Sequence, residues 1–122
     1  MSKYHNIKTL VDGRMFSSKA EAARYRELRL MEKAGQIADL VCQPPYPCYI
    51  GDKLICTYIA DFKYTTFPNQ PDLGREVVED VKGMKTPTYN LKKKLVRALH
   101  GIEIFESGLR KKAGRFSRTK KN

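Results

Sequence analysis

The sequence predicts an α/β fold in which a mixed central sheet is flanked by helices. Two segments with helical spacing, about 18–34 and 86–99, alternate with short stretches rich in β-branched and aromatic residues. At 122 residues, the chain is long enough for one modest hydrophobic core and too short for two. We therefore expect a single domain over residues 1–106.

The chain is strongly basic. It contains 24 Lys and Arg residues against 13 Asp and Glu residues, which gives a formal net charge of +11. This excess favours a polyanionic partner, most simply nucleic acid. Residues 107–122 hold seven of the basic residues and no acidic one, a pattern typical of a flexible basic tail. Residues 1–106 then carry a net charge of only about +4.

Composition also argues against several classes of protein. No apolar run is long enough to cross a bilayer, and the first residues lack the apolar segment of a signal peptide. The three cysteines form no CxxC pair, which favours reduced thiols, and a structural zinc site is not expected. We expect a cytoplasmic protein without a membrane partner, located in the host bacterial cytoplasm if a phage encodes it.

The first part of the chain predicts a hairpin followed by a helix. Asp12 and Gly13 between two alternating runs indicate a hairpin over residues 8–16. A helix should run from about 18 to 34, with Gly35 just past its end. The residues expected on its buried face are Ala23, Leu30, Met31 and Ala34, with Glu27 falling in the same stripe.

The middle of the chain predicts strands. The segments 37–41, 46–50 and 53–64 are each expected to be one strand, and a type II′ turn at Gly51 and Asp52 joins the last two. Asp61 lies within the apolar centre of the long strand 53–64. A loop should follow, between Pro68 and Gly74.

The segment 76–83 is the most informative part of the sequence. β-branched residues alternate with charged ones and Gly83 closes the segment, which predicts a short buried strand. Asp80 and Lys82 share one face of such a strand. Buried charges need partners, and either a bound divalent metal with a phosphate or a cross-strand ion pair would satisfy them.

The last part of the folded region predicts a helix and a strand. Thr86 and Pro87 are a good N-cap and first helical residue, and His100 and Gly101 should end the helix. A short strand over 102–105 should follow. The residues expected on the helix's buried face are Leu91, Leu95, Ala98 and Leu99.

Three separated carboxylates and a lysine stand on these predicted elements. Magnesium is bound through one or two carboxylates together with substrate phosphate and water. A nearby lysine can orient the attacking water and offset developing negative charge. Glu21, Asp61, Asp80 and Lys82 are therefore a set suited to magnesium-dependent phosphodiester cleavage.

Asp61, followed by Asp80-Val81-Lys82 and preceded by a helical Glu21, resembles the PD-(D/E)XK nuclease superfamily. The segments 17–22, 43–44, 58–62 and 78–83 look like those of small phage-associated endonucleases, some related to Holliday-junction resolvases. The resemblance covers about residues 3–106. It departs from the superfamily's name at Ala60, where that name has a proline.

The resemblance implies a restriction-endonuclease-like core and catalytic roles for Glu21, Asp61, Asp80 and Lys82. Asp61 and Asp80 would bind Mg²⁺, with Mn²⁺ as a substitute, and Glu21 would support the metal. We expect an endodeoxyribonuclease acting on branched DNA such as four-way junctions in phage recombination or replication, as a homodimer because two symmetric cuts favour a twofold axis. The basic residues expected to contact DNA are Lys3, Lys8, Arg14, Lys85, Lys92, Lys93, Arg110, Lys111 and Lys112.

Simpler interpretations remain open for each residue. Glu21 with Ser18 is also a capping box, in which the carboxylate satisfies only helix-end amides. Asp80 and Lys82 could be an ordinary surface ion pair. At the level of function, the alternatives are a non-catalytic nucleic-acid-binding module and an interaction protein whose basic tail docks onto acidic partners.

Overall fold

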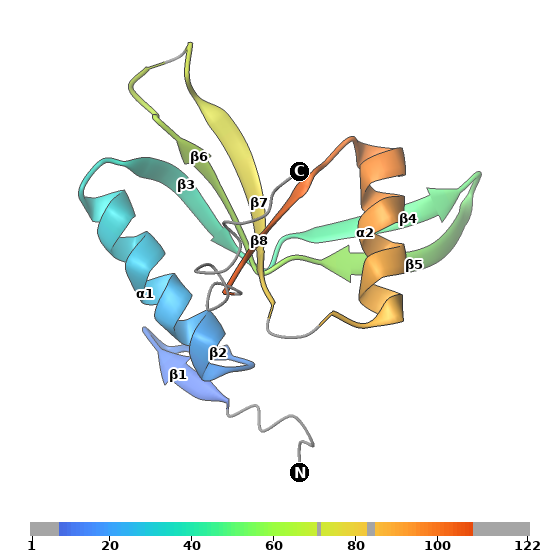
Figure 1. Cartoon of the computed structure of the whole chain (residues 1–122), viewed down its shortest axis with the longest axis horizontal. Helices are drawn as coiled ribbons and strands as arrows, with labels where there is room; N and C mark the ends of the chain where they lie inside the picture. The colour runs from blue at the N-terminus through green and yellow to red at the C-terminus, as the bar shows by residue number, and fades with distance from the viewer. Residues whose placement is uncertain (1–7, 71, 83–84, 109–122) are drawn as a thin grey trace, which may run out of the picture. The chain divides into compact units, whose positions relative to one another are not determined.

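The computed structural model describes residues 8–70, 72–82 and 85–108. These residues form two helices, a mixed four-stranded sheet of order β3-β6-β7-β8, and the hairpins β1-β2 and β4-β5 (Figure 1), which confirms the expected α/β class. The elements are β1 (Thr9–Val11), β2 (Arg14–Phe16), α1 (Lys19–Lys33), β3 (Ile37–Cys42), β4 (Pro45–Ile50), β5 (Lys53–Ile59), β6 (Phe62–Thr66), β7 (Arg75–Val81), α2 (Pro87–His100) and β8 (Ile104–Ser107).

The described chain divides into two compact units. The first contains the residues up to Cys42 and those from Lys63 to Val77, and the second contains the residues from Gln43 to Phe62 and from Val78 onward. No helix among the described residues is long and apolar enough to span a membrane.

In the first unit, the predicted hairpin and the predicted helix ends are confirmed. Asp12 and Gly13 have φ values of 53° and 74°, as a type I′ turn requires, and join β1 to β2. Ser18 caps α1 by accepting a hydrogen bond from the Glu21 N–H. At the other end, Gly35 has a φ of +80° and donates to the Glu32 carbonyl, which closes the helix as expected.

The buried face of α1 differs from the predicted one. The buried residues are Glu21, Ala22, Tyr25 and Leu28, whereas Ala23, Leu30 and Ala34 are exposed and Met31 is only half-buried. The β1-β2 hairpin sets this rotation. The Tyr25 ring packs on Phe16 with 4.9 Å between centroids, and its hydroxyl donates to Asp12 Oδ2 at 3.0 Å. A contact distant in sequence therefore outweighs the apolar spacing within the helix.

In the second unit, β4 and β5 form the expected antiparallel hairpin, and Gly51 in its turn has a φ of +62°. The predicted single strand 53–64 is wrong, because β5 ends at Ile59 and β6 begins at Phe62. The chain changes partners at this break: the Ala60 N–H donates to the Pro44 carbonyl, and the next N–H, of Asp61, donates to the Glu79 carbonyl. Asp61 thus lies in a junction between two strands instead of inside one.

Helix α2 begins at Pro87 after the N-cap Thr86 and is closed by Gly101, as predicted, and it packs on the β4-β5 hairpin (Figure 1). The predicted buried face is wrong: Tyr89 and Val96 are buried and Leu95 packs at the core's edge, whereas Leu91, Ala98 and Leu99 are exposed. The Tyr89 ring contacts that of Tyr58, with 6.3 Å between centroids, and this contact sets the helix rotation.

Strands β7 and β8 pair in parallel, with Val78 opposite Ile104 and Asp80 opposite Glu106. Val78, Glu79 and Asp80 are all buried, so β7 is covered on both faces at this point. The fully buried Glu79 accepts a hydrogen bond from Ser107 Oγ at 2.6 Å. Ser107, which we assigned to the tail, is therefore the last residue of β8, and the tail from residue 109 on lies outside the described residues.

Candidate active site

Asp61 and Asp80 are held together by reciprocal hydrogen bonds. The Asp61 N–H donates to Asp80 Oδ1 at 3.2 Å, and the Val81 N–H donates to Asp61 Oδ2 at 2.8 Å. Each carboxylate is thus fixed by the backbone of the other's segment. Asp80 is buried, with 1% of its surface exposed, and Asp61 is half-buried. The strand break at Asp61 is what turns this residue towards β7.

Gln43 contributes to this junction from the other side. Its N–H donates to the Asp61 carbonyl at 2.9 Å, and its φ of 56° lies in the left-handed region that non-glycine residues adopt at a cost of about 1 kcal/mol. The backbone of Asp61 is therefore bonded both to Gln43 and to β7. This arrangement restricts the position of the Asp61 carboxylate before any ligand binds.

Lys82 follows β7 directly, and its amino group lies over the ring of Tyr89. The distance from Nζ to the ring centroid is 4.3 Å, a cation–π contact. Burial, a hydrogen bond to Glu106 and the negative charges of Glu106, Asp80 and Asp61 raise the pKa of the Tyr89 hydroxyl. Tyr89 therefore remains a neutral donor at physiological pH.

Glu106 accepts hydrogen bonds on both carboxylate oxygens. Tyr89 Oη donates to Oε2 at 2.7 Å, Lys93 Nζ lies 3.0 Å from Oε2, and Lys85 Nζ lies 3.1 Å from Oε1. Burial raises the pKa of Glu106, but the hydrogen bonds from Tyr89, Lys93 and Lys85 outweigh it and lower the pKa to about 2. We call Glu106, Tyr89, Lys85 and Lys93 the Glu106 cluster.

Glu106 was not among the site residues predicted from the sequence. The signal was the parallel pairing of the last strand with β7, because aligning the buried residues Val78 and Ile104 places Glu106 opposite Asp80. Tyr89 was not among the predicted site residues either, although it connects Lys82 to Glu106. Both residues depend on contacts across the sheet that no short motif encodes.

Glu21 lies at the start of α1, in the first unit. Its Oε1 accepts from Ser17 Oγ at 2.7 Å and from the Ser17 N–H at 3.3 Å. Half of the predicted capping box is therefore present, since Ser18 Oγ accepts from the Glu21 N–H. The other half differs by one residue, because the Glu21 carboxylate accepts from Ser17 and not from the Ser18 N–H. The other oxygen, Oε2, is buried and has no hydrogen-bond partner among the described residues. The assignment of Glu21 as a catalytic residue and metal ligand stays a prediction.

A family model described as "Protein of unknown function (DUF1064)" matches residues 1–106. The chain belongs to the DUF1064 family. No curated protein and no solved structure matches the chain. The match to the DUF1064 model includes Asp61, Asp80, Lys82 and Glu106 and ends before the basic tail.

The basic residues that we expected to contact DNA fall into three groups in this DUF1064 protein. Lys85 and Lys93 bind Glu106, and Lys92 Nζ donates to the Thr57 carbonyl at 3.5 Å. Lys8 and Arg14 are exposed residues of the first unit. The remaining four, which lie outside the described residues, are Lys3, Arg110, Lys111 and Lys112.

The Asp61–Asp80 pair offers oxygen ligands of the kind that magnesium prefers. Within the described ranges, no three or more His, Cys, Asp or Glu side chains gather into a group that could hold a metal ion. Magnesium does not need such a group, because it is bound through one or two carboxylates and completes its shell with phosphate and water. A carboxylate presents about four lone-pair sites. The donor set of Asp61 and Asp80 is therefore of the kind that magnesium takes.

Proposed function

We propose that this protein is a magnesium-dependent endonuclease that hydrolyses phosphodiester bonds in DNA, acting best on branched DNA such as four-way junctions. The observation that carries the proposal is the reciprocal bonding of Asp61 and Asp80, with Lys82 two residues further along the chain. Two rigidly held carboxylates and a nearby ammonium group are the side chains that this chemistry uses.

The order of elements also supports a restriction-endonuclease-like core. Apart from the two hairpins, the order is α1, β3, β6, β7, α2, β8, and the sheet order is β3-β6-β7-β8. This matches the helix–strand–strand–strand–helix–strand order of the PD-(D/E)XK superfamily. Asp61 stands just before β6, and Asp80 lies near the end of β7.

In this proposal, Asp61 and Asp80 bind the metal through their carboxylate oxygens. Bound magnesium would polarise the phosphate and lower the pKa of a coordinated water. The backbone hydrogen bonds from Asp61 and Val81 hold the two carboxylates in place, so little rearrangement precedes binding. Mn²⁺, which also accepts carboxylate and water ligands, should substitute.

Lys82, two residues after Asp80, supplies the positive charge of the proposed site. Its amino group orients the attacking water and stabilises the negative charge that develops on the phosphate. The Tyr89 ring holds the amino group by a cation–π contact, and the hydrogen bond to Glu106 fixes the ring. Tyr89 and Glu106 are therefore positioning residues, which act through Lys82.

The alternative is a nucleic-acid-binding module without catalytic activity. Labelled linear duplex, single-stranded and four-way-junction DNA, each incubated with magnesium, calcium or chelator, distinguish the two functions. We expect cleavage with magnesium only and fastest on the junction, whereas calcium should support binding without efficient cleavage. If the protein binds DNA equally well under all three conditions and never cuts it, the catalytic proposal is wrong. Sedimentation on junction DNA tests the homodimer, which should give paired cuts.

A further inference from the structure

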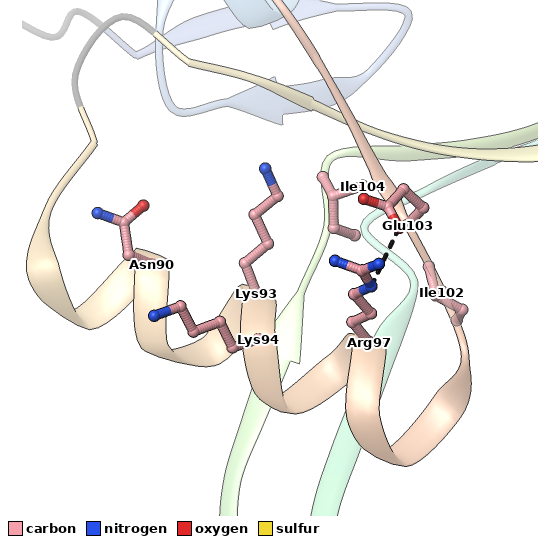
Figure 2. Close-up of a pocket in the computed structure, with 7 residues that line it drawn as sticks. All are labelled: Asn90, Lys93, Lys94, Arg97, Ile102, Glu103 and Ile104. Atoms are coloured by element: carbon pink, nitrogen blue, oxygen red, sulfur yellow. Dashed lines mark ion pairs between the residues drawn. The ribbon is translucent and has the colours of Figure 1, made fainter.

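Helix α2 and the segment leading into β8 line an open pocket of about 380 Å³ in the second unit (Figure 2). Its volume falls in the range of small-ligand sites. The lining residues are Asn90, Lys93, Lys94 and Arg97 from α2, and Ile102, Glu103 and Ile104 from the segment that follows. The four α2 residues are spaced by three, one and three positions, so they lie on one face of the helix.

The rim of the pocket is positively charged. Lys93, Lys94 and Arg97 face a single acidic lining residue, Glu103. Figure 2 shows the ion pair of Glu103 with Arg97, in which Nε lies 3.3 Å from Oε1. Both side chains are 71% exposed, so this pair is weak and water or a phosphate oxygen can replace it at little cost. Lys94 makes no ion pair with any described residue. The pocket thus favours an anion.

The floor of the pocket is apolar. Ile104 is 5% exposed and belongs to the hydrophobic core of the second unit, and Ile102 packs at the edge of that core. The aliphatic stems of Lys93 and Lys94 extend this surface, since lysine keeps only its amino group in water. A small inorganic anion would make no apolar contact with Ile102 and Ile104. A nucleotide, with one charged phosphate and an apolar sugar and base face, would use both parts.

The pocket adjoins the candidate active site through one shared residue. Lys93 lines the pocket and also bonds Glu106, which accepts the hydrogen bond from Tyr89 beneath Lys82. A strand bound in the pocket would therefore lie next to the Glu106 cluster, whose Tyr89 holds Lys82. The stacked base of an intact duplex cannot lay its face on the isoleucines, whereas an unpaired base can.

We propose that this pocket binds one unpaired nucleotide of the DNA strand that is cut. The phosphate contacts Lys94 and Arg97, which are three residues apart and therefore neighbours on α2, and the sugar and base lie on Ile102 and Ile104. Asn90 offers an amide donor and acceptor to the base edge. This subsite rests on the proposed function, in that it takes DNA as the substrate, and it adds a preference for DNA that carries an unpaired nucleotide next to the cut.

The test compares two double variants that remove the same charge. Lys94→Ala with Arg97→Ala alters the pocket, and Lys33→Ala with Lys53→Ala removes two exposed lysines elsewhere. Fluorescence anisotropy in chelator measures binding to a blunt duplex and to the same duplex with a single-stranded extension. We expect the pocket variant to lose about tenfold affinity for the extended probe beyond the control's loss. Its log–log salt slope should fall by about 0.7, the loss of one single-strand phosphate contact.

A second measurement does not depend on variants. Thymidine 5′-monophosphate should shift the methyl NMR signals of Ile102 and Ile104, and inorganic phosphate at the same concentration should shift them far less. Equal shifts would show a simple anion site and overturn the proposal, as would equal losses in the two double variants. Because binding is measured in chelator, the result is independent of cleavage: an intact subsite without cutting would refute only the nuclease, and cutting without the subsite would refute only this inference.

Discussion

The start of α1 and the Glu106 cluster both hold a buried or nearly buried carboxylate, but they do so by different means. The described hydrogen bonds of the Glu21 carboxylate come from Ser17, four positions away. Glu106 is bonded by Tyr89 and Lys93, which are 17 and 13 positions away. The first arrangement is encoded in a short motif, and the second exists only when α2 and β8 are in place.

The two carboxylates also differ in their capacity for a ligand. Both oxygens of Glu106 accept hydrogen bonds from cationic or hydroxyl donors. A carboxylate in this state stabilises the fold and is a poor metal ligand. Glu21 uses one oxygen for the helix start, and its other oxygen is buried without a hydrogen bond in the described part of the chain. Glu106 therefore has a structural role, whereas Oε2 of Glu21 keeps the capacity to accept a ligand.

The largest effect on the free energy of unfolding should come from the Glu106 cluster. Glu106→Gln removes a charge that three donors share and leaves two lysines without an anion, so we expect the free energy of unfolding to fall by about 2 kcal/mol in urea titrations. Glu103→Gln is the matched control, because its exposed pair with Arg97 should contribute less than about 1 kcal/mol. Equal losses in the two variants would mean that the Glu106 cluster does not stabilise the fold.

Glu106 should also make the free energy of unfolding depend on pH. The pKa of Glu106 is about 2 in the folded protein and near its usual value of 4.5 when unfolded, so its contribution is present above pH 4.5 and is lost as the pH falls towards 2. Because Lys85 and Lys93 are partly exposed, solvent screening reduces this contribution to about 1–2 kcal/mol. Urea titrations of wild type and Glu106→Gln between pH 2 and 6 should converge at the acidic end. A constant difference across this range would contradict the assignment.

Local signals in the sequence predicted the first hairpin turn and the ends of both helices correctly. Asp12-Gly13, Ser18, Gly35 and Thr86-Pro87 each stand where their turn or cap requires them. These residues act through the backbone within a few positions, so the sequence alone defines their role. The α/β class follows from the same signals.

The rotations of both helices could not be predicted in this way. Tyr25 and Tyr89 turn their helices towards Phe16 and Tyr58, which lie outside those helices, whereas aliphatic spacing indicated other faces. The break at Asp61 was missed for a related reason, because 53–64 is a continuous β-forming run whose pairing changes partner midway. Among the candidate site residues, Asp61, Asp80 and Lys82 were found from their types and spacing, whereas Tyr89 and Glu106 required the sheet register.

Substitutions at the start of α1 should lower the free energy of unfolding by a smaller amount. Ser18→Ala removes the N-cap acceptor for the Glu21 N–H and should cost about 1 kcal/mol. Ser17→Ala removes only the hydroxyl donor to Glu21 and should cost less, because the Ser17 N–H still bonds the same oxygen. Urea titrations of both variants measure the difference. A larger loss for Ser17→Ala would show that the Glu21 carboxylate, and not the cap, holds this end of the helix.

The most direct test of the account compares two adjacent buried carboxylates of β7. Asp80→Asn keeps the side-chain shape but removes the charge that we propose binds magnesium. Glu79→Gln removes a neighbouring charge while keeping an oxygen that accepts from Ser107. On four-way-junction DNA with magnesium, we expect Asp80→Asn to cut about a hundredfold more slowly or not at all, with DNA binding in calcium unchanged. Folded Glu79→Gln should cut at close to the wild-type rate. Wild-type cleavage by folded Asp80→Asn would contradict the assignment of Asp61 and Asp80 as the metal-binding pair.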